Sequence, residues 1–139
     1  SHMTAPTDPS KKIIISSRFE ELDRIVDEAE AFYKACLSDE EKVFTGVLLA
    51  SEAVTNAIEH GNASDPAKKV IIDFRLNGTQ AELWVEDEGD GFNRDDIANP
   101  LASENLLEDG GRGIFLIERL ADGVKYEKEG RRIGIFFSL

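Results

Sequence analysis

Hydrophobic and polar residues recur with two different periods along this chain, and each period predicts a different kind of element. Residues 12–17 are a short run rich in β-branched side chains, which predicts a strand. Over residues 19–37 and again over 38–60, apolar side chains recur at helical spacing, which predicts two amphipathic helices. The first half of the chain is therefore predicted to be one strand followed by two helices.

Both ends of the second predicted helix carry residues typical of helix caps. Ser38 and Glu41 have the spacing of a capping box, in which the hydroxyl and the carboxylate bind free backbone N–H groups. Gly61 and Asn62 follow the last helical residue and predict a left-handed helix end. We therefore expect the helix to start at Ser38 and to run to His60.

The second half of the chain alternates apolar and polar side chains, which predicts two β-hairpins. The predicted strands cover residues 68–76, 80–86, 123–128 and 131–139. Asn77-Gly78-Thr79 and Glu129-Gly130 supply the turns, and a short helix is predicted between the hairpins over 113–121. This order predicts an α+β protein, a two-layer α/β sandwich with a mixed, mostly antiparallel sheet and helices on one face. Residues 1–10 are interpreted as a tag scar and flexible leader, and residues 11–139 as a single domain.

The formal net charge of −12 excludes some classes of partner. It argues against direct nucleic-acid binding, which needs a basic surface, and against an anionic membrane. No apolar run approaches the roughly 20 residues that a membrane span needs. The one cysteine, Cys36, lies in an apolar helical pattern and is interpreted as a small core residue. We expect a cytoplasmic protein without disulfides.

Three polar residues, Glu52, Asn56 and His60, are spaced at i, i+4 and i+8 in the second predicted helix. This spacing places them on one stripe of an otherwise apolar helix. A carboxylate and an amide one turn apart can hold a hydrated Mg²⁺ and polarise a hydroxyl. A solvated helix stripe is the alternative for Glu52 and Asn56, and His60 is interpreted as structural.

Two glycine-rich segments follow at the ends of predicted elements. Asp87, Gly89 and Gly91 come directly after a strand, where the carboxylate suits an exocyclic amino group such as adenine N6. A tight acidic turn and, less well, a calcium loop are the alternatives. Residues 110–113, Gly-Gly-Arg-Gly, open a helix and offer N–H groups and a cation to a phosphate, although a flexible hinge has the same composition. The polar segment 93–112 between them predicts a functional lid.

The order of these motifs resembles that of a known family. Glu52-x-x-x-Asn56 in a helix, Asp87-x-Gly-x-Gly91 after a hairpin and Gly-x-Gly at a helix start are similar to the motifs of the Bergerat-fold ATPases. Within that group, residues 51–61 and 110–122 resemble the small bacterial anti-sigma-factor serine/threonine protein kinases. The resemblance covers roughly residues 12–139 and implies the Bergerat ATP-binding fold.

The resemblance also implies a role for each matching residue. Asn56 is expected to bind Mg²⁺, Glu52 to act as general base on a substrate hydroxyl, and Asp87 to accept a hydrogen bond from adenine N6. The other expected ATP-binding residues are Gly89, Gly91, Gly111, Arg112 and Gly113. One departure is that many relatives carry a Gly-Thr pair in the last hairpin, whereas residues 133–135 here are Ile-Gly-Ile, without a hydroxyl.

The function implied is an ATP- and Mg²⁺-dependent anti-sigma factor. Such a protein sequesters a sigma factor and phosphorylates a STAS-type antagonist of the anti-sigma factor on Ser or Thr, and it can form a homodimer. Three alternatives remain: a nucleotide-binding module without kinase activity, a catalytic fragment of a histidine kinase, and a structural domain without a ligand.

Overall fold

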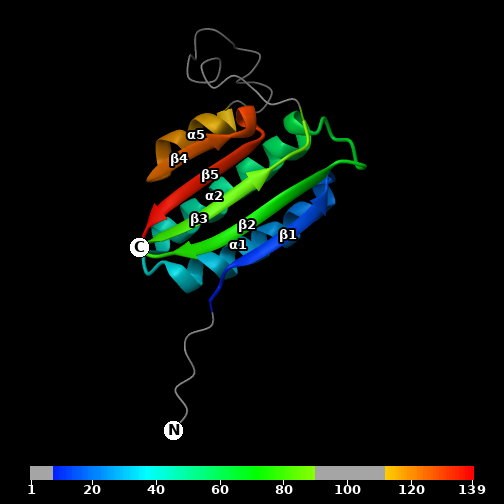
Figure 1. Cartoon of the computed structure of the whole chain (residues 1–139). Helices are drawn as coiled ribbons and strands as arrows, with labels where there is room; N and C mark the ends of the chain where they lie inside the picture. Colours follow the sequence, from blue (N-terminus) through cyan, green and yellow to red (C-terminus); the bar gives the residue numbers. More distant parts are fainter. Residues whose placement is uncertain (1–7, 90–111) are drawn as a thin grey trace.

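The computed structural model describes residues 8–89 and 112–139, and within them the elements follow the predicted order. Their bounds are β1 (Lys11–Ser16), η1 (Phe19–Glu21), α1 (Leu22–Cys36), α2 (Glu40–Asn56), η2 (Ala57–Gly61), β2 (Lys69–Asn77), β3 (Gln80–Glu86), α5 (Arg112–Leu120), β4 (Gly123–Glu127), η4 (Lys128–Gly130) and β5 (Arg132–Ser138). Figure 1 shows α1 and α2 on one face of the sheet. The predicted α+β sandwich is confirmed.

The sheet has five strands in the order β1-β2-β3-β5-β4. All four pairings are antiparallel, so the mostly antiparallel character of the prediction is confirmed, and its mixed character is wrong for the described strands, which form no parallel pair. Both predicted hairpins form: Gly78 turns the first with a φ of +60°, and residues 128–130 turn the second with positive φ throughout. β3 is the central strand of the sheet, so the loop that follows it begins between β2 and β5.

The core lies between the sheet and the helices. Ala81, Leu83 and Val85 of β3 belong to it, as expected for alternate residues that face the helices. Cys36, predicted to be a small core residue, is only partly buried and packs against the edge of this core. None of the described helices is long and apolar enough to cross a bilayer.

An aromatic cluster forms the part of the core between α1 and the sheet. The Tyr33 ring lies edge-on to Phe137 and Phe74, with centroids 5.7 and 6.4 Å away. Gly46 of α2 lets the two helices approach, because a Cβ there would lie 2.8 Å from the Tyr33 ring. Tyr33 is fully buried, and its hydroxyl has no hydrogen-bond partner among the described residues.

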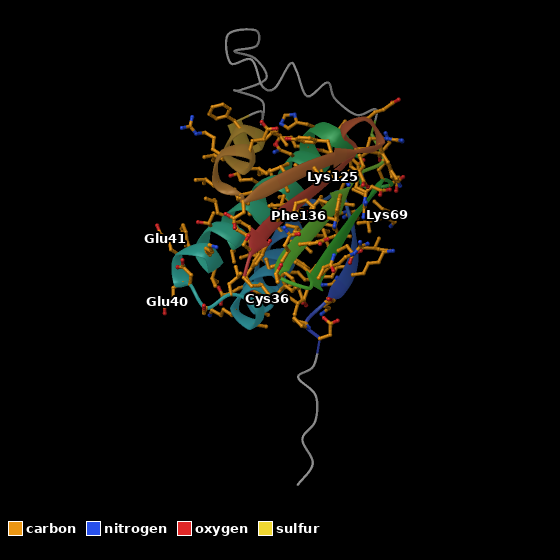
Figure 2. The ribbon with its side chains drawn as sticks, turned by 60° about the vertical axis from the view of Figure 1, so that its left-hand side comes forward. Cys36, Glu40, Glu41, Lys69, Lys125 and Phe136 are labelled. Atoms are coloured by element: carbon orange, nitrogen blue, oxygen red, sulfur yellow. The ribbon has the colours of Figure 1, made fainter. Side chains whose placement is uncertain are left out.

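The opposite face of the sheet carries a smaller cluster around Trp84. Phe136 stacks edge-on against the Trp84 ring at 5.5 Å, and the Arg132 guanidinium lies 4.1 Å from the ring centroid. Lys125 lies on the neighbouring strand β4 (Figure 2). The Trp84 indole N–H donates to Glu82 Oε1, so this large side chain is fixed at both its ring and its polar atom.

The cap predicted for the second helix is wrong by one residue. The helix starts at Glu40, and the N-cap is Asp39, whose Oδ1 accepts a hydrogen bond from Glu41 N at 2.9 Å. Ser38 lies one position too early for its hydroxyl to serve as the cap. Glu40 and Glu41 stand at the exposed start of α2 (Figure 2), where negative charge is favourable to the helix dipole.

The end predicted for the second helix is also wrong in its geometry. α2 ends at Asn56, and the chain continues as the π turn η2, in which Asn62 N donates to Ala57 O at 2.8 Å. Asn62 has a φ of −94°, so it is not left-handed. The left-handed residues are Ala63 and Ser64, with φ of 51° and 56°. The left-handed residues thus come two positions later than predicted, at Ala63 and Ser64 instead of Gly61 and Asn62.

Candidate functional site

The candidate site lies where η2 meets the loop after β3. Gly61, at the end of η2, lies so close to Asp87 that a Cβ at this glycine would be 2.3 Å from Asp87 Oδ2. A Cβ on Gly89 would be 1.8 Å from the carbonyl oxygen of Gly61. Gly61 is therefore packed against the Asp87 side chain, and Gly89 against the backbone of Gly61. The helix that carries Glu52 and Asn56 thus meets the loop that carries Asp87.

Asp87 is held in a defined position as the chain leaves β3. Its backbone N–H donates to Arg131 O at 2.9 Å, and its Oδ1 accepts from Gly89 N at 2.8 Å. Partial burial raises the pKa of the Asp87 carboxyl above its ordinary value, and the Gly89 hydrogen bond opposes this effect. An ionised carboxylate has further acceptor positions beyond the one used by Gly89. Asp87 can therefore accept a hydrogen bond from a ligand amino group.

Asn56 and Glu52 lie in the last two turns of α2, and both are partly exposed. The Nδ2 atom of Asn56 is buried and has no hydrogen-bond partner among the described residues. A buried amide without a partner is costly, and at a functional site it commonly marks a group that binds a ligand or an ion. The unpartnered Nδ2 can donate a hydrogen bond to an acceptor such as a phosphate oxygen, whereas a metal ion would need the Oδ1 atom of the same amide.

His60 takes a different position from the other two residues of the predicted stripe. It lies in the π turn and is exposed, with Nε2 4.0 Å from Glu59 Oε2. Because η2 widens the helix after Asn56, the i+8 residue no longer follows the α-helical stripe. The interpretation of His60 as a structural residue stays a prediction.

The donor set around Asn56 limits how a metal ion could be held. Across residues 8–89 and 112–139, no three His, Cys, Asp or Glu side chains lie together in a metal-binding arrangement. Mg²⁺ commonly keeps several waters and binds through one or two protein oxygens together with substrate phosphates. The Oδ1 atom of Asn56 is an oxygen donor of the kind that such an ion would use.

The phosphate end of the predicted site is described only in part. α5 starts at Arg112 and packs against α2, so the predicted helix start at this glycine-rich segment is confirmed to within a residue. Gly91, Gly111 and nearly all of the predicted lid 93–112 lie outside the described residues, and only the backbone of Arg112 and Gly113 is described. The roles of these residues stay predictions.

Asn62 is a residue of this site that the sequence interpretation missed. Its side chain is fully buried, donates through Nδ2 to Ser17 Oγ at 2.7 Å and Lys69 O at 2.9 Å, and accepts through Oδ1 from Glu88 N at 2.7 Å. The sequence carried only its turn propensity as a signal. Its partners lie on three other segments of the chain, and no local pattern reveals them.

Residues 133–135, which lack the Gly-Thr pair of many Bergerat-fold relatives, lie in β5 where it pairs with β3. Ile133 and Ile135 belong to the core, and Gly134 lies under Trp84, where a Cβ would be 2.6 Å from the ring. The positions beside Gly134 are thus filled by apolar packing. A hydroxyl at either of them would enter the same apolar side of the sheet.

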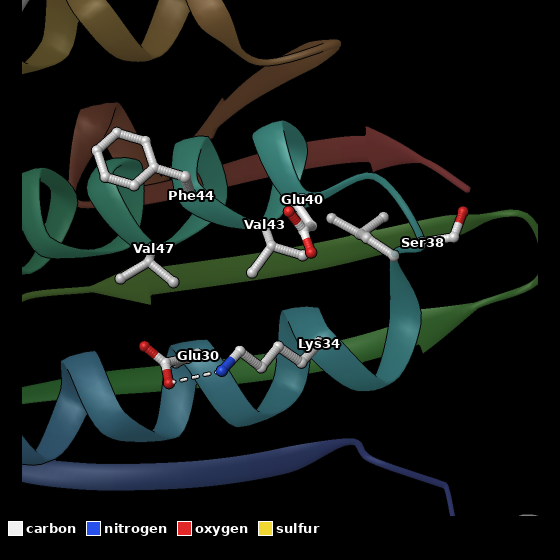
Figure 3. Close-up of a pocket in the computed structure, with 8 residues that line it drawn as sticks. Glu30, Lys34, Ser38, Glu40, Val43, Phe44 and Val47 are labelled. Atoms are coloured by element: carbon white, nitrogen blue, oxygen red, sulfur yellow. Dashed lines mark hydrogen bonds and ion pairs between the residues drawn. The ribbon is translucent and has the colours of Figure 1, made fainter.

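A groove elsewhere on the surface has no part in the predicted site. It lies between α1 and α2, has a volume of about 560 Å³, and is lined by residues that include Lys34, Val43, Phe44 and Val47 (Figure 3). Lys34 on its rim is paired with Glu30 at 3.0 Å. None of the predicted site residues contributes to its lining.

Comparison with known proteins gives one family and a set of relatives. Residues 15–136 match the family described as the histidine kinase-like ATPase domain. The chain is 39% identical over 79 residues to an anti-sigma F factor of Oceanobacillus iheyensis, which covers 55% of this chain and 54% of that protein. It is 39% identical over 83 residues to an anti-sigma F factor of Shouchella clausii, covering 58% of this chain and 57% of that protein.

A relative with a different name gives a similar match. The serine-protein kinase RsbW of Bacillus subtilis is 35% identical over 86 residues, which cover 58% of this chain and 54% of that protein. The chain thus spans about half the length of the curated relatives that it matches. The motif resemblance drawn from the sequence is confirmed by these matches.

Proposed function

The chain belongs to the family of histidine kinase-like ATPase domains, and we propose that it is an ATP-dependent anti-sigma factor that phosphorylates an antagonist protein on serine or threonine. The observation that carries the proposal is the junction of η2 with the loop after β3, where Gly61 and Gly89 bring Asp87 against the helix of Glu52 and Asn56. The relatives named anti-sigma F factor and serine-protein kinase RsbW support the same class of function.

Asp87 is proposed to recognise the base of the nucleotide. Its Oδ1 is engaged with Gly89 N, which fixes the plane of the carboxylate and leaves acceptor positions for an exocyclic amino group. Gly89 and Gly91 would let the base and ribose approach the backbone. Because guanine carries an oxygen where adenine carries its N6 amino group, this carboxylate would favour ATP over GTP.

Asn56 is proposed to bind Mg²⁺ with the phosphates, and Glu52 to act as general base. When bound, the metal would neutralise charge on the phosphates during transfer. Glu52 would accept the proton of the incoming Ser or Thr hydroxyl, for which its partly exposed position on α2 leaves access. Gly111, Arg112 and Gly113 would contribute N–H groups and a cation to the phosphates at the start of α5.

The partners are proposed to be a sigma factor and a STAS-type antagonist in the cytoplasm. Phosphate on the antagonist would add about −1.5 to −2 charges. This chain has a net charge of −12, so the phosphorylated antagonist would be repelled and the sigma factor would be bound again. A homodimer fits this role, and sedimentation equilibrium would detect it.

Phosphotransfer to purified STAS-domain proteins tests the proposal. Incubation with labelled MgATP is expected to place phosphate on a serine or threonine of the cognate antagonist. Glu52→Gln should bind ATP with little change but lose the transfer, because the general base is gone while the nucleotide site is intact. Binding of ATP without transfer to a confirmed partner would instead favour a regulatory module without kinase activity.

A further inference from the structure

Asn62 is the centre of a closed ring of hydrogen bonds beside the candidate site. Its Oδ1 accepts from Glu88 N at 2.7 Å, Glu88 Oε1 accepts from Lys69 N at 2.8 Å, and Lys69 O accepts from Asn62 Nδ2 at 2.9 Å. The ring joins the end of η2, the loop after β3 and the start of β2. Asn62 and Lys69 are 7 residues apart in the sequence, and Glu88 follows them by 26 and 19 residues.

The ring is anchored further into the molecule through Ser17. Asn62 Nδ2 also donates to Ser17 Oγ at 2.7 Å, and Ser17 Oγ donates to Lys68 O at 2.8 Å. Ser17 and Asn62 are 2% and 0% exposed, so water cannot replace these contacts without a rearrangement. Both Nδ2 donor positions of Asn62 and one of the two acceptor positions on its Oδ1 are used, so the orientation of the amide is fixed.

The ring of hydrogen bonds restrains Glu88, which lies within the predicted nucleotide-binding loop. Glu88 follows Asp87 directly and precedes Gly89, so the bond from Glu88 N to Asn62 lies between the two predicted nucleotide contacts. Gly61, the neighbour of Asn62, is the residue that touches both Asp87 and Gly89. The Asn62 side chain, directly after η2, therefore restrains the position of the Asp87–Gly89 loop relative to η2.

We propose that Asn62 is a positioning residue for nucleotide recognition, which holds the Asp87–Gly89 loop in register with the end of α2. This inference rests on the proposed function, because the proposed function assigns recognition of the nucleotide base to this loop. Asn62 itself does not touch the ligand: it acts through the Glu88 N–H group. Its effect is on the affinity and base selectivity of the site, and not on the proton transfer assigned to Glu52.

Nucleotide binding by Asn62→Ala, measured by calorimetry with ATP and GTP, tests the proposal. Losing the bond to Glu88 N is expected to weaken ATP binding by about tenfold and to reduce the preference for ATP over GTP. Ser17→Ala is the matched control: it removes the far anchor but leaves the bond to Glu88 N, and is expected to change ATP affinity by less than about threefold. Asn62→Ala with wild-type affinity and selectivity would overturn the proposal.

A conservative variant separates positioning from stability. Asn62→Asp keeps an acceptor for Glu88 N but loses both donors and places a charge in a buried position, so it should lower stability. Its ATP affinity is nevertheless expected to stay within about threefold of wild type, measured at a temperature where the variant is folded. A parallel loss of ATP binding in the folded Asn62→Asp and Asn62→Ala variants would reduce Asn62 to a structural role.

Hydrogen exchange of the Glu88 amide in the nucleotide-free protein tests the same inference without any ligand. Asn62→Ala is expected to speed this exchange by about tenfold or more, whereas Ser17→Ala should change it little. If the wild type binds no ATP, the proposed function fails, and the exchange rates alone then decide whether Asn62 holds the loop. Unchanged Glu88 exchange in Asn62→Ala would overturn the inference even if ATP binds.

Discussion

At the scale of single residues, two buried polar atoms without partners have different meanings. The Tyr33 hydroxyl is buried in the core, on a residue whose ring packs against other aromatic rings, and the Asn56 amide lies at the end of α2 beside the candidate site. The first has no route to a ligand and is a cost of using tyrosine in an apolar cluster. The second lies where a ligand would satisfy it.

Tyr33→Phe is therefore expected to stabilise the protein. The substitution removes an unpartnered hydroxyl and keeps the ring contacts with Phe74 and Phe137. The free energy of unfolding in urea should rise by about 1 kcal/mol. Tyr33→Leu is the comparison that loses the ring and should be destabilised. A loss of stability in Tyr33→Phe would show that the hydroxyl has a partner.

Asp87→Asn should separate stability from nucleotide binding. Burial raises the pKa of the Asp87 carboxyl above its ordinary value of 3.8. Between the unfolded-state pKa and the higher folded-state pKa, the folded protein therefore binds more protons than the unfolded chain. The stability contributed by this group therefore falls as the carboxyl ionises. Asparagine keeps an acceptor for Gly89 N and removes the buried charge.

The expected result is a variant that gains stability relative to wild type as the pH rises from about 4 to about 7. The same variant should bind ATP at least about tenfold more weakly, because a charged acceptor for the amino group is lost. Urea titrations across the pH range and calorimetry measure the two effects. A constant stability difference at every pH would contradict the buried ionisation of Asp87.

At the scale of elements, the molecule depends on the contact between η2 and the loop after β3. Gly61→Ala places a Cβ 2.3 Å from Asp87 Oδ2, so the Asp87 carboxylate must be displaced from its position. We expect a loss of about 1–3 kcal/mol in stability, together with loss of ATP binding. Thermal melts and calorimetry would measure both.

Gly123→Ala in β4 is the matched control for this prediction. A Cβ there would meet only Phe136 at 3.7 Å, an ordinary contact distance, and the φ of Gly123 is not in the left-handed region. Its stability should change by less than about 1 kcal/mol, and its ATP affinity should not change. Equal effects of the two substitutions would contradict the importance of the Gly61–Asp87 contact.

The elements that the sequence predicted correctly are those whose pattern is local. The alternation in β2 and the helical spacing in α1 depend on which face of each element is buried, and neighbouring residues in the sequence carry this signal. The π turn after Asn56 and the N-cap at Asp39 were missed. Both depend on hydrogen-bond geometry that several residue types can satisfy.

The candidate site shows the same limit. Asp87 and Gly89 could be predicted because a glycine-rich stretch after a strand is a local signal. Asn62 could not, since its four-segment network arises only after β1, β2 and η2 have assembled. Gly61 was predicted as a helix stop, but its absent Cβ serves the contact with Asp87.

At the scale of the whole molecule, charge should control the release of a phosphorylated antagonist. The net charge of −12 repels an added phosphate group over distances that salt screens. We expect phosphorylation to weaken antagonist binding strongly at about 0.05 M salt and much less at about 0.5 M. Surface plasmon resonance with both forms of the antagonist measures this. A difference independent of salt would indicate a steric cause.

The most direct test of the central claim is the binding of ATP to the wild type and to Asn56→Ala, with and without Mg²⁺. Calorimetry is expected to give Mg²⁺-dependent binding to the wild type, and Asn56→Ala should lose this dependence because the amide oxygen of Asn56 would hold the metal with the phosphates. Absence of ATP binding to the folded wild type would contradict the proposed function and leave the glycine-rich loops as structural turns.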